Sequence, residues 1–280
     1  MEKRIRKAQY AGSFYPGDPS TLKKLIGDIA ALEQQSVNYS LASKRIIGGV
    51  VPHAGLVYSA YEAVHFYEIL SRSNQAFDTV VIVNPNHSGV GHGLFNTCGY
   101  SFWETPLGMI DVDEAFSNAT GITACSPAHI REHSGEVQLP FLRFYLKNEW
   151  KAVIITMNSQ TPDAAEELAF RIREAEQKTQ RKIIFLASSD FSHYETQDVG
   201  YAKDQYVIDP ILELDAGKVY REVKKHQVSA CGYGPIMTLI DYARLAVPDP
   251  KVKLLRRGHS GEVSRSERVV DYVSFLFYQD

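Results

Sequence analysis

The chain alternates short, continuous apolar runs with longer segments in which apolar residues recur at helical spacing. The first helical segment covers residues 21–32. Asp18 or Ser20 can cap its first turn, and Pro19 stands near its start, where proline is tolerated. The polar stretch at residues 34–44 then predicts a loop.

The same pattern predicts an α/β fold. Strands are expected at residues 46–51, 79–83, 152–156, 182–187, 252–255 and 269–277. Further helices are expected at residues 60–70, 163–179, 205–214, 218–226 and 235–245. Continuous apolar strands that alternate with helices indicate a central, mostly parallel sheet with helices on both faces. We therefore predict one α/β domain over residues 1–280, with its ligands bound beyond the carboxyl ends of the strands.

Histidines follow three of the predicted strands directly. His53 stands in Pro-His-Ala-Gly, His87 in Asn-Pro-Asn-His-Ser-Gly, and His193 in Ser-Ser-Asp-Phe-Ser-His. A single histidine at a strand end is usually a hydrogen-bonded loop residue. Parallel strands, however, bring all three to one edge of the sheet, so we expect a shared pocket there.

Cys231 precedes the predicted helix at residues 235–245, and a thiol near a helix N-terminus is expected to have a lowered pKa. Taken alone, it is equally well explained as a small buried apolar residue. Together with His53 and His87 it would form a set of two nitrogens and one sulfur. Such a set suits iron, copper or zinc, and three protein ligands with open positions are typical of a catalytic metal site.

Asp190 and His193 are the candidate catalytic residues beside that set. An imidazole can exchange a proton near neutral pH, and Asp190 can orient a histidine or bind the metal itself. The alternative for Asp190 is a turn residue whose carboxylate accepts hydrogen bonds from nearby backbone amides.

Three further residues are candidates for the pocket wall. His133 can line the site, and Phe14 and Tyr15 lie in a Gly/Pro-framed turn of a kind that often walls a ligand pocket. An aromatic plug for the core is an equally good interpretation of that turn. Ser134 and Glu136 are explained as the N-cap and first turn of a helix.

Composition narrows the class of protein. The chain has 280 residues, a net charge of −3 and no long basic block, which argues against a nucleic-acid partner. No apolar run approaches the roughly 20 residues that span a bilayer, and no apolar segment follows the charged start as in a secretory signal. Three widely spaced cysteines do not indicate a disulfide framework. We expect a cytoplasmic protein without a membrane partner.

The residues resemble the Memo family, whose bacterial and archaeal members are called AmmeMemoRadiSam system protein B. The matching motifs occur in the family's order over nearly the whole chain. They are Gly-Ser-Phe-Tyr-Pro at 12–16, Pro-His-Ala-Gly at 52–55, Pro-Asn-His at 85–87, Glu-His-Ser at 132–134, Ser-Ser-Asp-Phe-Ser-His at 188–193 and Cys-Gly-Tyr-Gly-Pro-Ile at 231–236. The resemblance implies a fold similar to the class III extradiol dioxygenases, which are non-haem iron enzymes that open catechol rings.

In those dioxygenases two histidines and a glutamate hold Fe(II), and another histidine acts as acid and base. The resemblance implies that His53 and His87 are the ligand histidines and that His193 has the acid/base role. Cys231 stands where the carboxylate ligand is expected, and a thiolate changes metal preference and redox behaviour. The family also implies association with a radical SAM protein and an AMMECR1-like protein. Eukaryotic members are similar to phosphotyrosine-peptide binders, but they usually have Trp where this chain has Phe14.

These observations leave three hypotheses. The first is a metal-dependent oxidoreductase of dioxygenase ancestry that uses iron, with copper or zinc as alternatives. The second is a module that binds a small molecule or a peptide in the old metal pocket without catalysis. The third, a metal-dependent hydrolase, lacks a carboxylate-rich ligand set and ranks last.

Overall fold

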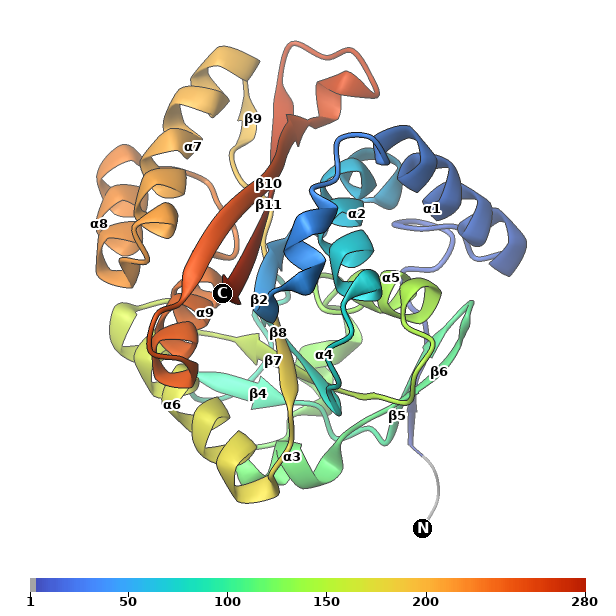
Figure 1. The fold of residues 1–280 in the computed structure, drawn as a ribbon, viewed down its shortest axis with the longest axis vertical. Coiled ribbons are helices and arrows are strands. Elements are labelled where there is room, and N and C mark those ends of the chain that lie inside the picture. Colours follow the sequence, from blue (N-terminus) through green and yellow to red (C-terminus); the bar gives the residue numbers. More distant parts are fainter. Residues whose placement is uncertain (1–3) are drawn as a thin grey trace.

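The computed structural model describes residues 4–280. An eight-stranded sheet forms the centre of the fold (Figure 1). Its centre is parallel and consists, in spatial order, of β2 (Arg45–Val51), β8 (Ile183–Ser188), β3 (Thr79–Pro85) and β7 (Lys151–Met157). Antiparallel strands extend both edges: β11 (Val269–Gln279) and β10 (Lys251–His259) beyond β2, and β4 (Phe95–Thr97) beyond β7. The short β9 (His193–Glu195) pairs with β11.

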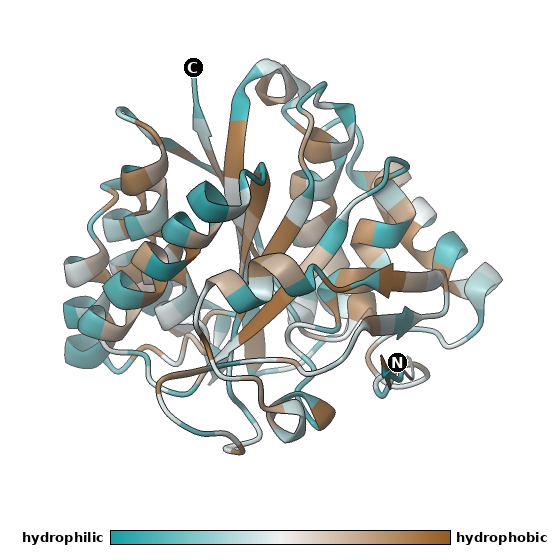
Figure 2. Ribbon diagram, turned by 90° about the horizontal axis from the view of Figure 1, so that it is seen from below, coloured by the Kyte–Doolittle hydropathy of each residue, from teal (hydrophilic) through white to brown (hydrophobic). Residues whose placement is uncertain are grey.

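Helices cover both faces of this sheet (Figure 1). One layer contains α1 (Pro19–Glu33), α2 (Leu56–Arg72) and α5 (Gln138–Tyr145), and the other contains α6 (Pro162–Thr179), α7 (Gln197–Leu212), α8 (Ala216–His226) and α9 (Tyr233–Ala246). Side chains alternate across each strand, so Val81 and Val83 pack in one hydrophobic core while Val80 and Ile82 pack in the other. Figure 2 shows the resulting pattern, with hydrophobic strands inside and hydrophilic positions on the outer helices.

The fold class predicted from the sequence is confirmed, because four parallel strands form the centre of the sheet and helices cover its two faces. The side chain of Asp18 caps α1 by accepting a hydrogen bond from the backbone N–H of Thr21 at 2.8 Å. The helix expected at residues 205–214 begins earlier, at Gln197. That the whole chain forms one domain stays a prediction.

The structure contains short elements that the apolar pattern did not predict. A second sheet joins β1 (Ile5–Arg6), β5 (Phe102–Thr105) and β6 (Gly108–Asp111), and is followed by α3 (Glu114–Ala119) and α4 (Ser126–Ile130). Short 3-10 helices lie at η1 (Tyr39–Ser43) and η2 (Ser260–Glu262). Elements of two to six residues are too short to show a periodicity in the sequence.

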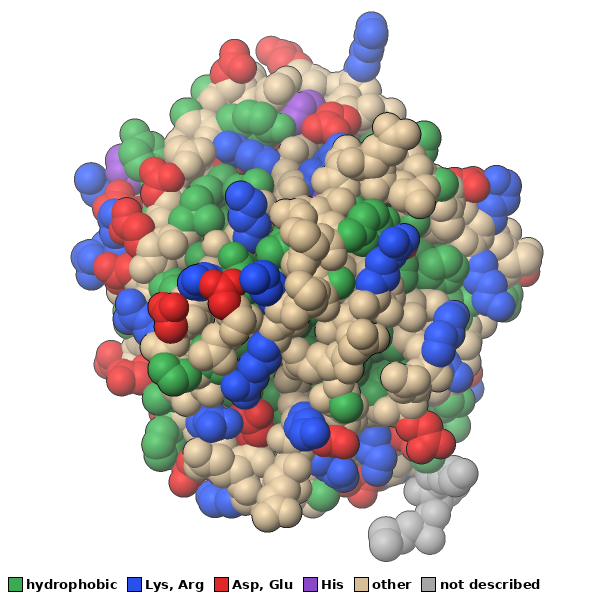
Figure 3. All heavy atoms as spheres, in the orientation of Figure 1, with side chains coloured by type: hydrophobic (Ala, Val, Ile, Leu, Met, Phe, Trp, Pro, Cys, Tyr) green, Lys and Arg blue, Asp and Glu red, His purple; other side chains and the backbone are tan. Residues whose placement is uncertain are grey.

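No helix within residues 4–280 combines the length and the apolar character needed to cross a bilayer. On the face drawn in Figure 3, basic and acidic side chains are interspersed rather than gathered by sign.

Candidate metal centre

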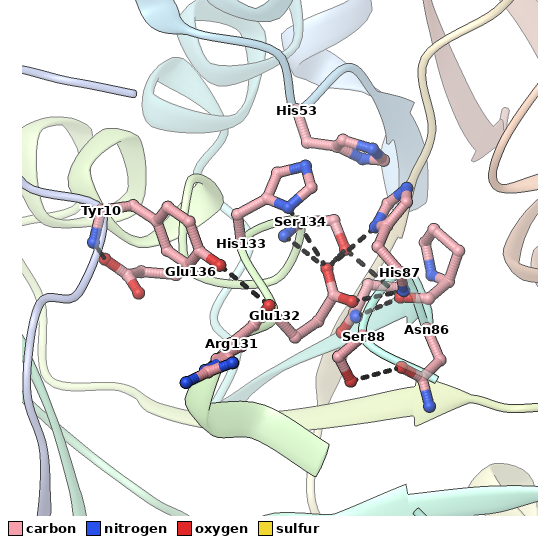
Figure 4. Close-up of polar contacts among 12 residues, drawn as sticks. Tyr10, His53, Asn86, His87, Ser88, Arg131, Glu132, His133, Ser134 and Glu136 are labelled. Carbon is pink, nitrogen blue, oxygen red and sulfur yellow. Dashed lines mark hydrogen bonds and ion pairs between the residues drawn. The ribbon is translucent and has the colours of Figure 1, made fainter. Parts of the chain in front are cut away.

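Three histidines meet at the carboxyl edge of the parallel strands. His53 follows β2, His87 follows β3, and His133 comes from the loop before α5. One ligating nitrogen from each lies within 4.8 Å of the other two. Figure 4 shows the three rings turned toward one another, and the ring centroids of His53 and His87 are 5.3 Å apart. Within the part of the chain that the structure describes, this is the only such group of potential metal ligands.

Buried hydrogen bonds fix the tautomer of His53. Its Nδ1 lies 2.9 Å from the Ser188 hydroxyl oxygen. That hydroxyl donates its one hydrogen to the carbonyl of Ser134 at 2.8 Å, and it accepts from the Gln138 amide at 3.0 Å. The hydroxyl can therefore only accept from His53, so Nδ1 carries the hydrogen. The lone pair of Nε2 is then available to a metal ion.

His87 is held by Glu132. The backbone N–H of His87 donates to Glu132 Oε2 at 2.6 Å, and its Nδ1 lies 3.0 Å from Oε1. Burial alone would lower the pKa of His87, but the hydrogen bond and charge of Glu132 outweigh it, so the pKa is raised. A carboxylate on the outer nitrogen orients a ligating imidazole and increases its basicity.

His133 contacts both His87 and Phe14. Its ring lies 4.7 Å from that of His87 and 4.5 Å from that of Phe14, between centroids. Burial, and then the neighbouring His53, lower the pKa of His133 to about 4. Burial also lowers the pKa of His53 well below its ordinary value. Both rings are therefore neutral at pH 7, which is the form that binds metal.

Cys231 lies beside this group. Its Sγ is 3.2 Å from Nε2 of His53, and it accepts a hydrogen bond from the backbone N–H of Asp190 at 3.3 Å. Burial, followed by the charge of Asp190, raises the pKa of the thiol well above its ordinary value. The lowered pKa expected from the sequence is therefore wrong. Although α9 begins at Tyr233, two residues after Cys231, burial dominates. A bound cation favours the thiolate.

Asp190, on the loop after β8, and His193, the first residue of β9, flank the cluster. Asp190 is 4% exposed, and its Oδ1 accepts from the backbone N–H of His53 at 2.7 Å. Nδ1 of His193 lies 3.0 Å from the carbonyl oxygen of Ser229. Because a carbonyl only accepts, Nδ1 of His193 carries the hydrogen and Nε2 is its basic nitrogen.

The two aromatic candidates differ in position. Phe14 packs on His133, with 4.5 Å between the ring centroids. Tyr15 is 3% exposed, belongs to the core under α1 and α2, and donates its hydroxyl hydrogen to Glu136. Tyr10, which sequence reasoning did not select, also lies beside His133, with its ring 5.6 Å from that of His133 (Figure 4).

The expected helix cap at Ser134 is wrong. The helix α5 begins only at Gln138, and the Ser134 hydroxyl donates to Glu132 Oε1 at 2.6 Å instead. Glu136 is not in the first turn of this helix but accepts hydrogen bonds from the backbone of Tyr10 and the hydroxyl of Tyr15, and it pairs with the buried Arg6. Ser134 therefore holds Glu132 in place beside His87, and Glu136 anchors the N-terminal segment.

The structure thus groups His53 and His87 with His133, and it places the sulfur of Cys231 beside His53. Sequence reasoning did not select Gln138 or Glu132 as supporting residues. Glu132 could have been suspected from its place beside His133, whereas nothing in the sequence around Gln138 marks it. The donor set of neutral imidazoles and a thiol fits a transition metal rather than magnesium or calcium.

Comparison with known proteins gives the family. The model of Memo-like proteins matches residues 6–276. A MEMO1 family protein of Sulfolobus acidocaldarius is 40% identical over 98% of this chain and 99% of its own length. The MEMO1 family proteins of Archaeoglobus fulgidus and Methanococcoides burtonii are 36% and 34% identical, over 98% and 97% of this chain and 99% of theirs.

The fold also matches a solved structure. The crystal structure of an uncharacterized protein from Escherichia coli K12 aligns with a TM-score of 0.51 at 12% identity, covering 83% of this chain and 99% of that one. At this identity the match shows the fold alone. The fold and the whole-length matches define a Memo-like α/β protein with a histidine cluster that could bind a metal ion. The chain belongs to the Memo family.

Proposed function

We propose that this protein binds a redox-active transition metal through His53, His87 and Cys231, with iron preferred over copper or zinc. The observation that carries the proposal is the convergence of one ring nitrogen from each of three histidines, with a sulfur 3.2 Å from Nε2 of His53. Nitrogen and sulfur ligands together suit these metals. His133 is the alternative third ligand, since its nitrogen belongs to the same close group.

We further propose that the centre serves an oxidoreductase. A bound iron or copper ion would supply electron transfer to oxygen or to an organic substrate. His193 would move a proton at Nε2, because its Nδ1 is engaged with Ser229. Asp190 would hold the backbone of His53 in place and balance charge beside His193. Phe14 and His133 would exclude water from one side of the ligand.

The second candidate is a binding module. The observation that favours it is the aromatic wall of Tyr10 and Phe14, which lie edge to face at 5.1 Å beside His133 and offer a surface for a small molecule or peptide. Association with a radical SAM protein and an AMMECR1-like protein remains a proposal based on the family. Under this hypothesis the metal would order the binding site, and the protein would catalyse no reaction.

Metal analysis after anaerobic purification tests the first proposal. We expect near-stoichiometric iron or copper in the wild type and its loss in the double variant His53→Gln/Cys231→Ser. The exposed imidazole of His92 supplies a control, His92→Gln, which should keep the metal. A wild type that neither contains nor takes up metal would overturn the proposal. A metal-loaded protein that consumes neither catechols nor oxygen would favour the binding module.

A further inference from the structure

A cavity lies at the amino ends of β2 and β8, the end of the sheet opposite to the histidine cluster. Its volume is about 720 Å³. The loop that follows α2 and the last turn of α9 complete its walls. In Figure 1 the C-terminus, which follows β11, lies beside β2 at this end of the sheet. None of the lining residues belongs to the proposed metal centre.

One part of the cavity wall is apolar. It consists of aliphatic side chains that are buried in the fold, namely Ile46, Ile47, Ile183 and Val247. The half-buried Ala246 at the end of α9 adds to this surface. The volume lies within the range of roughly 300–1,000 Å³ in which proteins hold small organic molecules. The cavity therefore has room for the apolar body of a ligand and not only for a bare ion.

The rest of the wall is mainly basic. Its charged residues are Lys44, Arg45, Lys182 and Glu176. The acid is compensated, because Glu176 Oε2 accepts from the hydroxyl of Tyr242 at 2.9 Å and pairs with Arg173 at 2.5 Å. Lys44 is also compensated, since its Nζ lies 2.9 Å from Asp280.

Arg45 and Lys182 supply two positive charges that have no carboxylate partner among residues 4–280. The guanidinium of Arg45 donates to the neutral amide oxygen of Gln279 at 3.3 Å. Asp78 accepts from the backbone N–H of Lys182 at 2.8 Å, but the ammonium of Lys182 has no partner within the described chain. The two residues stand at the starts of β2 and β8, which are neighbours in the sheet. Uncompensated charge of one sign in a cleft attracts a ligand of the opposite sign.

We propose that this cavity binds a small organic phosphate, a phosphate monoester on an apolar body. The monoester carries about two negative charges at neutral pH, which match the two unpaired cations. Arg45 and Lys182 donate charge-assisted hydrogen bonds to the phosphate oxygens, and Ile46 and Ile183 contact the apolar body. The side-chain amide of Asn74, which has no partner among the described residues, offers a further hydrogen bond at the rim. The proposal is independent of the metal and of its chemistry.

Calorimetric titration of the full-length protein with n-hexyl phosphate tests the proposal at about pH 7.5, where the phosphate is close to fully ionised. 1-Hexanol lacks the charge of this probe, and inorganic phosphate lacks its apolar body. We expect saturable binding of hexyl phosphate, weakened about tenfold by Arg45→Gln and by Lys182→Gln, because each change removes a hydrogen bond to a charged group. Lys225→Gln, which removes an exposed cation outside the cavity, should leave binding unchanged.

Filling the cavity gives a second test that removes no charge. Ala246→Phe adds a large side chain at the apolar part of the wall and should also weaken binding of hexyl phosphate. Arg45 and Lys182 are exposed, so their substitution should leave the fold intact, and circular dichroism checks each variant.

Four results would overturn the proposal. The first is that 1-hexanol or inorganic phosphate binds as tightly as hexyl phosphate, and the second is that neither Arg45→Gln nor Lys182→Gln weakens binding. The third is equal binding of hexanoate, which would remove the preference for phosphate. The fourth is loss of binding in the double variant His53→Gln/Cys231→Ser, which would place the phosphate at the metal centre.

Discussion

His53 Nδ1 lies 2.9 Å from the hydroxyl oxygen of Ser188, and that hydroxyl can only accept from it. This one contact decides which nitrogen of His53 carries the hydrogen, and so leaves the lone pair on Nε2. Further buried hydrogen bonds hold Ser188 in place. Gln138 donates to the Ser188 hydroxyl and accepts from the hydroxyl of Tyr67 at 2.6 Å. The orientation of His53 is therefore set by buried residues on β8, α5 and α2.

Removing the Ser188 hydroxyl should weaken metal binding. In Ser188→Ala the Nδ1–H of His53 loses its acceptor, so the ring can rotate or change tautomer. We expect a loss of about 10- to 100-fold in metal affinity, measured by competition with a chromophoric chelator. Ser274→Ala is the matched control, because Ser274 is buried in β11 and its hydroxyl has no partner among the described residues. Equal affinity in the two variants would contradict this role of Ser188.

The charge of Glu132 should matter in the same way for His87. Glu132→Gln keeps the shape of the side chain but removes the carboxylate that accepts from Nδ1 and from the backbone N–H of His87. We expect metal affinity to fall by about 10- to 100-fold with the fold retained. The variant should also lower the pKa of His87, which a two-dimensional NMR titration of the ring measures. A His87 titration that matches the wild type would argue against the pairing.

Cobalt substitution should distinguish the two candidates for the third ligand. A thiolate ligand gives a sulfur-to-cobalt charge-transfer absorption, which an imidazole does not. We expect this band in the wild type and its loss in Cys231→Ser, whereas His133→Gln should keep it. A spectrum unchanged by Cys231→Ser but altered by His133→Gln would identify His133 as the ligand instead.

The pair of Arg6 and Glu136 should stabilise the N-terminal segment. Both side chains are buried, and Arg6 also donates to the carbonyl of His129 at 2.9 Å. Glu136→Gln leaves a buried guanidinium without its counter-charge, which costs about 3–5 kcal/mol. Urea unfolding measures the loss, and Asp28→Asn, in an exposed pair with Lys24, should change little. Similar free energies of unfolding for both variants would show that Arg6 does not need the carboxylate.

A buried acid pair should make stability depend on pH. Burial, and then the neighbouring Asp204, raise the pKa of Asp271 to about 8. The unfolded chain loses this proton near the ordinary value of 3.8, so the native state binds more protons between these limits. Stability should therefore decrease as the pH rises through this window, by up to about 1.4 kcal/mol per pH unit for one proton.

The variant Asp271→Asn tests this pH dependence. It removes the raised group and should flatten the decrease in the free energy of unfolding between pH 5 and pH 8, the part of the window about 4 to 8 where other carboxylates change little. Asp241→Asn serves as a comparison on α9. The pKa of Asp241 is raised to about 6, which predicts a pH dependence over a narrower range. A wild type whose free energy of unfolding is constant or increases over this range would contradict the raised pKa of Asp271.

The sequence predicts the central fold because the four parallel strands are continuous apolar runs. Val80 to Val83 are all fully buried, so nothing polar interrupts the pattern. The place of His53 and His87 follows from the same strands, since each comes directly after one. The resemblance supplied the role of Cys231, which no periodicity indicates.

Other parts of the site depend on contacts between distant segments. Ser134 has the local pattern of a helix cap, but the nearby Glu132 carboxylate takes its hydroxyl instead. Gln138 reaches Pro52 and Ser188 across the sheet edge, separations of 86 and 50 residues that no local pattern encodes. The small sheet of β1, β5 and β6 likewise depends on Arg6, which is buried through contacts with residues more than 120 positions away.

The central claim is that a metal ion sits on Nε2 of both His53 and His87 with Cys231 as the sulfur ligand. Anomalous diffraction from crystals of the iron- or copper-loaded protein tests it most directly. We predict one strong peak at the metal edge, about 2.1 Å from each Nε2 and about 2.3 Å from the sulfur. A loaded protein whose anomalous peak lies elsewhere, or contacts only one of these residues, would contradict the account.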